Sequence, residues 1–258
     1  MELPRVRHLA AAIDWNQIEN FLGYGPIDAR VVFLGMEEGQ SDPDSLAADL
    51  AHRSRFGRTM DLKEAHQGIK GTDRYFDPAT GTIQRTWRPM CHLMLRRQSA
   101  DAAPTAHSRL RYQALDLGRA DGDTLLVELL PYPKRTADDW PDIYRTRHPT
   151  RAVYERAMLP KRIDILSRAL RQHSRELIIC YGKANWIYYQ QVIRMAFGIE
   201  TRDWAAAVPG WQDVLTAVTG YTRVVLVKHF CCSEFNTEAQ LDRLSAAALG
   251  QGSAYEVV

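Results

Sequence analysis

Cysteine is scarce in this sequence of 258 residues, and the four that are present form no recognisable binding pattern. Cys91 and Cys180 are isolated, while Cys231 and Cys232 are adjacent and cannot easily pair with each other. None belongs to a C-x-x-C motif, the spacing typical of zinc sites and redox-active thiols. We therefore expect reduced thiols, and no motif in the sequence requires a metal or another cofactor.

Long apolar runs are also missing. Nowhere do about 18 apolar residues follow one another, so the sequence predicts no membrane-spanning helix. The first residues, Met1 to Arg5, lack the order of charged and then apolar residues that defines a signal peptide. These absences predict a soluble, cytoplasmic protein that does not bind membranes.

The composition excludes disorder and collagen. Hydrophobic residues make up 45% of the chain and charged residues 25%, with 16 Gly and 12 Pro, as is typical of globular proteins. No linker rich in Ser, Gly or Pro divides the sequence, and its length suits one large α/β domain. We therefore expect a single domain over residues 1–258.

Net charge is nearly absent, but the basic residues are unevenly distributed. The 33 Lys and Arg exceed the 31 Asp and Glu by only +2, whereas residues 85–162 contain 15 Lys and Arg against 9 Asp and Glu. Aromatic side chains are interleaved with these basic residues, namely Trp87, Tyr112, Tyr132, Trp140, Tyr144 and Tyr154. Phosphates attract Arg and bases stack on aromatic rings, so the segment suits a nucleic-acid surface. A solvated, Arg-rich surface is the simpler explanation of the charges alone.

Four short apolar runs predict the strands of a parallel sheet. They cover residues 30–35, 124–130, 177–181 and 223–228. The second run is expected to stop at Pro131, because proline cannot donate to a sheet ladder. Continuous apolar strands of this kind are buried on both faces.

Helical patterns separate the apolar runs. They cover residues 84–98, 151–173, 183–197 and 237–249. Pro160 is expected to kink or interrupt the second, and Asp42 and Pro43 are expected to open a further helix. The sequence therefore predicts an α/β fold, a three-layer αβα sandwich around a central four-stranded parallel sheet.

Ligands of open parallel sheets bind at the carboxyl ends of the strands. The first strand is followed by Gly35, Met36, Glu37, Glu38 and Gly39. This segment lacks the G-K-[ST] and G-x-G-x-x-G motifs, and its two carboxylates repel phosphate. Glycines around a carboxylate suit a tight turn that brings an acid close to a substrate. A plain strand-to-helix turn with solvated glutamates remains the commoner explanation.

The last strand ends at His229, with Ser233 close behind. A histidine in this place can donate a hydrogen bond to developing negative charge, although a lone histidine is more often structural. Cys231 and Cys232 are interpreted as packing residues, because no feature that would lower a thiol pKa is visible beside them.

Together these motifs resemble the uracil-DNA glycosylase superfamily. The shared features are a strand that ends in a G-x-x-x-G loop with an acid in its middle (Gly35 to Gly39), three further apolar strands, and a last strand that ends in His229. The resemblance covers residues 31–249. It implies a four-stranded parallel sheet between helices and a nucleotide that is flipped out of double-stranded DNA and bound at the strand ends.

The resemblance also implies roles for single residues. Glu37 occupies the place of the family's Asp or Asn that positions or activates the attacking water. His229 matches the histidine that hydrogen-bonds the pyrimidine O2 as negative charge accumulates on the leaving base. Glu128 falls where many members carry an Asn that reads the base edge, and Phe235 lies in the stretch that often carries a minor-groove wedge.

Two further groups complete the expected site. The residues expected to bind the base are Gly35, Met36, Glu38, Gly39, Glu128 and Tyr132. The residues expected to contact DNA are Lys134, Arg135, Arg145, Arg147, Arg151, Ser233 and Phe235. Residues 131–151 then form a functional loop, with a surface loop that buries its aromatic residues as the equally weighted alternative.

Departures from the family pattern suggest the substrate. Glu38 stands where proline is usual, and Gly39 stands where uracil-specific members have a tyrosine that excludes substituents at pyrimidine C5. A carboxylate at Glu128 accepts from the exocyclic amine of cytosine, whereas uracil offers an acceptor there. The residues at Gly39 and Glu128 both favour a 5-modified cytosine. The iron–sulfur cluster of some members is not expected, because the cysteines lack its spacing.

The leading hypothesis is a monofunctional DNA glycosylase without cofactors or protein partners. It hydrolyses the N-glycosidic bond of a bulky 5-substituted cytosine, such as glucosylated hydroxymethylcytosine in phage DNA, leaves an abasic site and serves antiviral defence. One alternative is a repair glycosylase for uracil or mismatched thymine. The other is a non-catalytic DNA-binding module on the same fold, which Glu38 and the unusual residues Phe230, Cys231 and Cys232 suggest.

Overall fold

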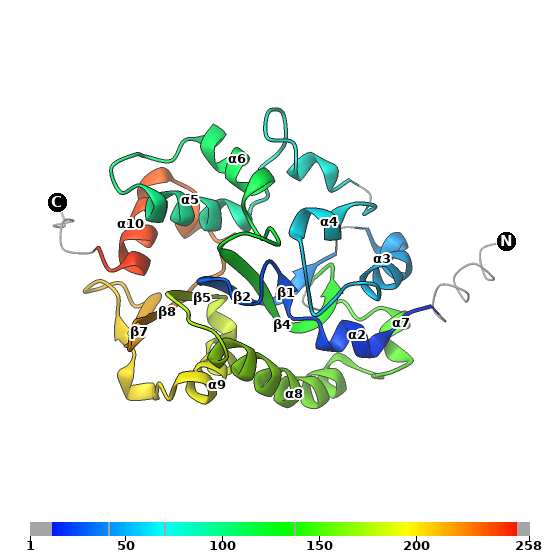
Figure 1. Cartoon of the computed structure of the whole chain (residues 1–258). Helices are drawn as coiled ribbons and strands as arrows, with labels where there is room; N and C mark the ends of the chain where they lie inside the picture. Colours follow the sequence, from blue (N-terminus) through cyan, green and yellow to red (C-terminus); the bar gives the residue numbers. More distant parts are fainter. Residues whose placement is uncertain (1–11, 41, 70, 137, 252–258) are drawn as a thin grey trace.

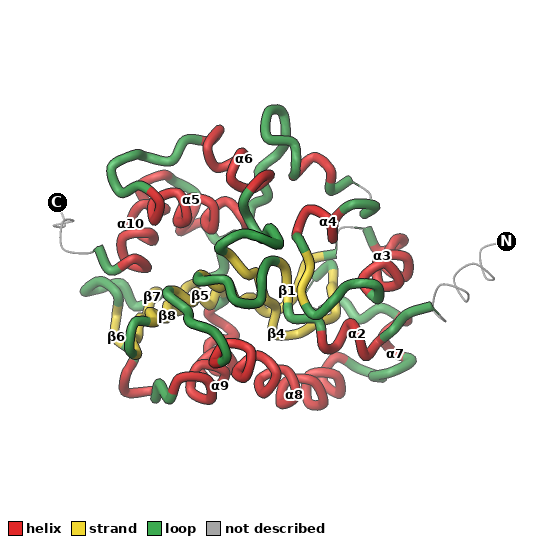
Figure 2. Tube along the Cα trace, in the orientation of Figure 1, coloured by secondary structure: helices red, strands yellow, loops and turns green. Residues whose placement is uncertain are grey.

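One mixed β-sheet forms the centre of the protein, and helices cover both of its faces (Figures 1 and 2). The computed structural model describes residues 12–40, 42–69, 71–136 and 138–251. The strands are β1 (Gly23–Tyr24), β2 (Val31–Gly39), β3 (Thr59–Met60), β4 (Thr124–Lys134), β5 (Leu177–Tyr181), β6 (Ala205–Ala206), β7 (Val214–Thr219) and β8 (Thr222–Val227). The helices are α2 (Trp15–Asn20), α3 (Leu46–Arg53), α4 (Leu62–His66), α5 (Trp87–Gln98), α6 (Ala106–Leu115), α7 (Asp142–Arg145), α8 (Arg151–Arg171), α9 (Trp186–Phe197) and α10 (Glu238–Leu249).

The middle of the sheet consists of four neighbouring parallel strands. The strand order is β3-β1-β4-β2-β5-β8-β7-β6, and β4, β2, β5 and β8 run parallel to one another. On either side, β1 pairs antiparallel with β4, and β7 pairs antiparallel with β8. The α/β class is confirmed, but the predicted number of four strands is wrong, because further strands extend the sheet at both edges.

Two of the predicted strands are longer than expected. β2 continues to Gly39, so the G-x-x-x-G segment belongs to the strand and its register against β4 shifts between Glu37 and Gly39. β4 continues through Pro131 and Pro133 to Lys134. Its other neighbour, β1, pairs only near Leu126, so the proline-bearing end has a free edge on which no backbone donor is needed.

The core has two parts, one on each face of the sheet. Val32 and Leu34 of β2 pack with α2, α8 and α9 on one face, whereas Val31 and Phe33 pack with α4, α5 and α10 on the other. All four side chains are at most 1% exposed, as expected for strands covered on both faces. Figure 1 shows α8 and α9 below the sheet, and α5, α6 and α10 above it.

The helix predictions hold except at two places. α8 runs through Pro160, so the interruption expected as one of two outcomes does not occur. A 3₁₀ turn (Pro43–Ser45) follows Asp42, which accepts a hydrogen bond from the Asp44 backbone N–H, and α3 begins only at Leu46. In the described part of the chain, no helix is both long and apolar enough to span a bilayer.

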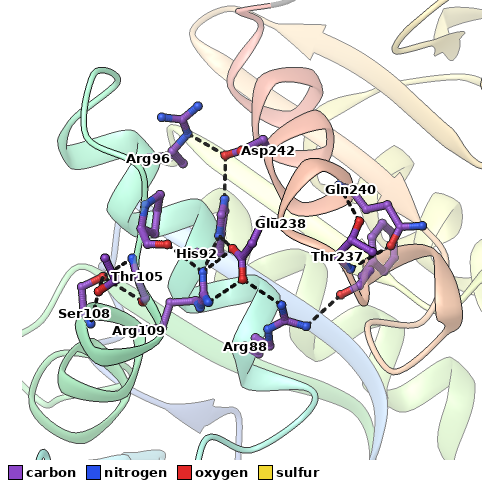
Figure 3. A network of polar contacts seen from close by, with 12 residues as sticks. Arg88, His92, Arg96, Thr105, Ser108, Arg109, Thr237, Glu238, Gln240 and Asp242 are labelled. Atoms are coloured by element: carbon purple, nitrogen blue, oxygen red, sulfur yellow. Dashed lines mark hydrogen bonds and ion pairs between the residues drawn. The ribbon is translucent and has the colours of Figure 1, made fainter.

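A network of charged side chains joins α5, α6 and α10 (Figure 3). Arg109 of α6 donates to both carboxylate oxygens of Glu238, at 2.6 and 2.7 Å. His92 of α5 is bonded to Asp242 through Nε2 at 3.0 Å, and Arg88 also reaches Glu238. These contacts hold α10 in place, and α10 directly follows residues 229–237, the segment that begins with His229.

Candidate functional site

Gly35 lies in the middle of β2, beside two polar side chains of the neighbouring strands. Its Cα pairs with Glu128 across β2 and β4. A Cβ atom at this position would lie 2.3 Å from the Tyr181 hydroxyl and 2.4 Å from Oε2 of Glu128. Only glycine leaves room for these two polar side chains, which therefore meet over the backbone of β2.

The Glu128 carboxyl has one bonded and one unbonded oxygen. The Tyr181 hydroxyl donates to Oε1 at 2.8 Å, whereas Oε2 is buried and has no hydrogen-bond partner. Burial raises the pKa of Glu128 to about 8, and the nearby carboxylates of Glu38 and Glu37 also raise it, against the hydrogen bond from Tyr181. The carboxyl is therefore largely protonated at neutral pH.

Glu37 faces a different set of partners. Its Oε2 lies 2.9 Å from Nζ of Lys134 and 3.4 Å from a guanidinium nitrogen of Arg151. Its Oε1 is buried without a hydrogen-bond partner. Burial raises the pKa of Glu37, and the two cations oppose that shift. The carboxylate thus keeps one free acceptor, the capacity that a group needs to hold and deprotonate a water molecule.

Glu38 is tied down by two side chains and is not available to a base in this structure. Arg53 of α3 binds both of its oxygens, at 2.5 and 2.7 Å, and the Tyr24 hydroxyl donates to Oε2 at 2.8 Å. Burial pushes the pKa of Glu38 upward, but the charge and hydrogen bonds of Arg53, with smaller effects of His66 and Tyr24, together hold the pKa below its usual range. This clamp fixes the strand end where the family pattern has a proline.

His229 follows β8 after one intervening residue, Lys228, and lies at the surface. Its ring packs edge-on against Tyr181, with the ring centroids 5.9 Å apart. Nδ1 accepts a hydrogen bond from the Cys231 backbone N–H at 3.2 Å, so the proton of the neutral ring sits on Nε2. Partial burial lowers the pKa of His229, which favours this neutral form. A chain of contacts therefore connects His229 through Tyr181 to Glu128.

The other two residues of the first motif differ in their surroundings. Met36 is half-buried and packs against the core on the α8 face. Gly39 has no atom within 4 Å of where its Cβ would lie. It pairs with Lys134, and Lys134 and Gln40, the residue after Gly39, help to line a pocket of about 200 Å³. Open space therefore lies beside Gly39.

Tyr132 is not a base-binding residue in this structure, which corrects the prediction. It is fully buried, its ring stacks on Tyr154 and Tyr144 at 4.5 and 4.8 Å, and its hydroxyl donates to Glu19 at 2.9 Å. Trp140 packs in the same cluster. The alternative reading of residues 131–151, a surface loop with its aromatic residues buried beneath it, is the one observed.

The predicted DNA-contacting cations divide into exposed and internally paired residues. Lys134 has a side chain only 2% exposed and pairs with Glu37, so its assignment to phosphates is wrong, because burial keeps it from DNA. Arg151 is shared between Glu37 and Glu155, and Arg147 pairs with Glu19 at 3.0 Å. Arg135 is exposed, and so is Arg145, which pairs with the exposed Asp142 at 3.4 Å and donates to the Trp140 carbonyl at 3.2 Å.

The segment after His229 places its two predicted residues differently. Ser233 is exposed at the start of a 3₁₀ turn (Ser233–Phe235). Phe235 is 2% exposed and packs on Phe230, with ring centroids 6.0 Å apart. Phe235 therefore does not protrude as a wedge, because its apolar ring is part of the core on the α5 and α10 face.

Two residues that sequence reasoning missed organise the site. Tyr181 ends the apolar run of β5 and could have been found as a hydroxyl at the carboxyl end of a buried strand. Arg53 gave no signal, because its partner Glu38 is 15 positions away in another element. Within the described residues, no group of three or more His, Cys, Asp or Glu is arranged to hold a metal ion.

No protein-family model matches the chain, and no curated protein matches its sequence. The functional argument therefore depends on the geometry at the strand ends.

Proposed function

We propose that this protein is a DNA glycosylase that flips a modified pyrimidine out of double-stranded DNA and hydrolyses its N-glycosidic bond. The observation that carries the proposal is the bond between Tyr181 and Glu128 over Gly35, with His229 packed against Tyr181 and Glu37 two residues further along β2. A block of four parallel strands between helices, the layout implied by the resemblance to uracil-DNA glycosylases, supports it.

Each step of the reaction has a group suited to it. The free Oε1 of Glu37 accepts the attacking water and takes its proton. Nε2–H of His229 donates to the pyrimidine O2, where negative charge accumulates as the bond to C1′ breaks. Because the neutral ring holds its proton on Nε2, this donor is ready before the base arrives. The product is an abasic site.

A 5-substituted cytosine is the substrate that fits best. Gly39 leaves the side of the pyrimidine C5 open, and the pocket beside it, lined by Gln40 and Pro133, gives room for a bulky group. The Glu128 carboxyl suits the amine-bearing edge of cytosine. We propose glucosylated hydroxymethylcytosine in phage DNA as the substrate and antiviral defence as the role.

The experiment is base release from DNA carrying uracil, mismatched thymine, cytosine, hydroxymethylcytosine or its glucosylated form. Release from glucosylated DNA is expected, with a loss of about 10²–10⁴-fold in Glu37→Gln, the range of a general base. Release of uracil or thymine instead would make the protein a repair enzyme. Tight binding of DNA with no release from any substrate would favour a non-catalytic module.

Glu19 provides a matched control for Glu37. It is also a buried carboxylate held by one lysine, Lys161 at 3.0 Å, and one arginine, Arg147 at 3.0 Å. Its Oε1 additionally accepts from the Tyr132 hydroxyl, so both oxygens are bonded. Glu19→Gln therefore weakens a similar ion pair on α2, at a carboxylate that has no unbonded oxygen to hold a water molecule, and it should leave the rate of base release unchanged.

A further inference from the structure

Three carboxyl groups on β2 and β4 lie close enough to affect one another electrostatically, and they differ in the cations that neutralise them. Glu38 is bound by the guanidinium of Arg53, and Glu37 by Lys134 and Arg151. Among the described residues, no cation forms an ion pair with the Glu128 carboxyl. A buried carboxyl that lacks a cation and faces two carboxylates lowers its free energy by keeping its proton.

The hydrogen bonds fix where that proton sits. The Tyr181 hydroxyl has one hydrogen, and Oε1 of Glu128 accepts it at 2.8 Å. Burial raises the pKa of Tyr181 as well, so the phenol does not deprotonate at neutral pH. The proton of the Glu128 carboxyl is therefore on Oε2, the buried oxygen that has no partner.

From this geometry we propose that Glu128 is the general acid of the reaction and protonates N3 of a cytosine-type base as it leaves. Tyr181 is the positioning residue that keeps the acidic proton on Oε2. The inference rests on the proposed function and adds a chemical role to a residue expected only to read the base. Cytosine carries an acceptor at N3 beside its amine, so an O–H donor and a carbonyl oxygen together match this edge.

The step balances in atoms and charge. The C1′–N1 bond breaks, and its electron pair stays with the base. The proton on Oε2 of Glu128 moves to N3, so the base departs neutral and Glu128 becomes a carboxylate. Water adds to C1′ and gives one proton to Glu37, and exchange with solvent returns both carboxyl groups to their starting states. Protonation matters because a cytosine that leaves as an anion is a poorer leaving group than uracil, whose anion is delocalised over two carbonyl groups.

Several groups face Glu128 and set the pH at which it loses its proton. They are Glu37 and Glu38 of β2, Tyr181 of β5, Arg162 of α8 and Tyr189 of α9. Arg162 is fully buried and gives its hydrogen bonds to backbone carbonyls, including that of Glu128 at 2.8 Å, so it does not bond the carboxyl.

The first measurement needs no substrate. Isotope-edited infrared spectra of the full chain should show a protonated carboxyl band near neutral pH that is missing in Glu128→Gln and disappears as pH rises above about 8. Absence of this band from the wild-type protein would overturn the proposal. Thermal unfolding of Glu128→Gln checks that the variant is folded.

The second measurement is single-turnover base release from two DNAs that carry the same 5-substituent on cytosine or on uracil. On the cytosine DNA, the wild-type rate should fall about tenfold per pH unit above the pKa of Glu128. Glu128→Gln should be slower by about 100-fold or more and lose that fall, while binding DNA equally well. On the uracil DNA, the wild-type rate should not fall above the pKa of Glu128, and Glu128→Gln should not be about 100-fold slower. Tyr181→Phe removes a hydrogen bond that lowers the pKa of Glu128. The rate of base release should therefore begin to fall at a higher pH in this variant.

The failures are distinguishable. Equal rates and equal pH profiles for wild type and Glu128→Gln on cytosine DNA would overturn the general-acid role and leave the glycosylase intact. If the rate of base release begins to fall at the same pH in Tyr181→Phe as in the wild-type protein, the positioning role of Tyr181 is overturned. Absence of release from every DNA by the wild-type protein would overturn the proposed function and, with it, the catalytic step.

Discussion

The carboxyl groups at the strand ends and the network between α5, α6 and α10 use similar side chains, but they differ in whether every polar atom has a partner. In the network, Arg109, Glu238, His92 and Asp242 all have bonded polar atoms (Figure 3). At the strand ends, Glu37 and Glu128 each keep a buried oxygen without a partner. Buried polar atoms are normally satisfied, so the first arrangement suits a structural joint and the second suits a site that completes its bonds with a ligand.

Among the variants that compare the two regions, replacement of one histidine in each should have the largest effect. His229→Ala removes the donor to the base and should slow release by about 10²–10³-fold, the loss typical of one oxyanion-hole donor. His92→Ala should leave the rate per folded molecule unchanged and lower the free energy of unfolding, because His92 is 1% exposed and bonded to Asp242. Single-turnover kinetics and urea unfolding measure the two effects. If both variants lose activity in proportion to their loss in the free energy of unfolding, the two histidines do not differ in role.

The two regions should also respond to pH in opposite directions. The pKa of Glu128 is raised to about 8 by burial, so its contribution to stability is fully present below the unfolded value of about 4.3 and is lost as pH rises through 8. Between about pH 5 and 8, the wild-type free energy of unfolding should fall relative to Glu128→Gln by on the order of 3 kcal/mol. Urea unfolding at both pH values measures this difference. Parallel curves for the two proteins would show that Glu128 is charged in the folded state.

His92 gives the opposite sign. Burial lowers its pKa, although Asp242 opposes the shift. The unfolded chain therefore takes up the proton first as pH falls below about 6.5. Stability that depends on neutral His92 is lost on acidification, and His92→Gln should remove that loss.

The sequence predicted the elements whose signal is local. The run of apolar residues at 177–181, for example, is the strand β5 in the structure. β1, β3 and β6 are two residues long, too short for any periodicity. Tyr132 was assigned to the base-binding site because its aromatic ring suits stacking, but the ring is fully buried and packs in the core. Burial of this kind is not visible in the local sequence. The bond between Tyr181 and Glu128 spans 53 positions, and no local pattern encodes it.

Breaking the network itself should have a moderate effect. Arg109→Met removes the two bonds to Glu238 and the bond to the Pro104 carbonyl. Because each hydrogen bond to a charged group contributes about 1.5–3 kcal/mol and Glu238 is half exposed to water, we expect a loss of about 2 kcal/mol in the free energy of unfolding. Base release by the folded variant should be unchanged, which a rate measured well below the melting temperature tests. A lower rate would connect the α10 network to the site through the His229 segment.

The smallest expected effect concerns DNA affinity and separates two adjacent cations. Arg135 is exposed at the end of β4, whereas the side chain of Lys134 beside it is 2% exposed and pairs with Glu37. Arg135→Ala should weaken DNA binding a few-fold at low salt and reduce the salt dependence by about one counterion, with stability unchanged within about 0.5 kcal/mol. Arg168→Ala is the control, because Arg168 is also an exposed arginine and lies at the far end of α8 from Arg151, which contacts Glu37. Equal losses in salt titrations of both variants would mean that DNA is attracted by overall charge. A loss confined to Arg135 would place the phosphates at the same end of the sheet as the unpartnered carboxyl oxygens, where the chemistry requires them.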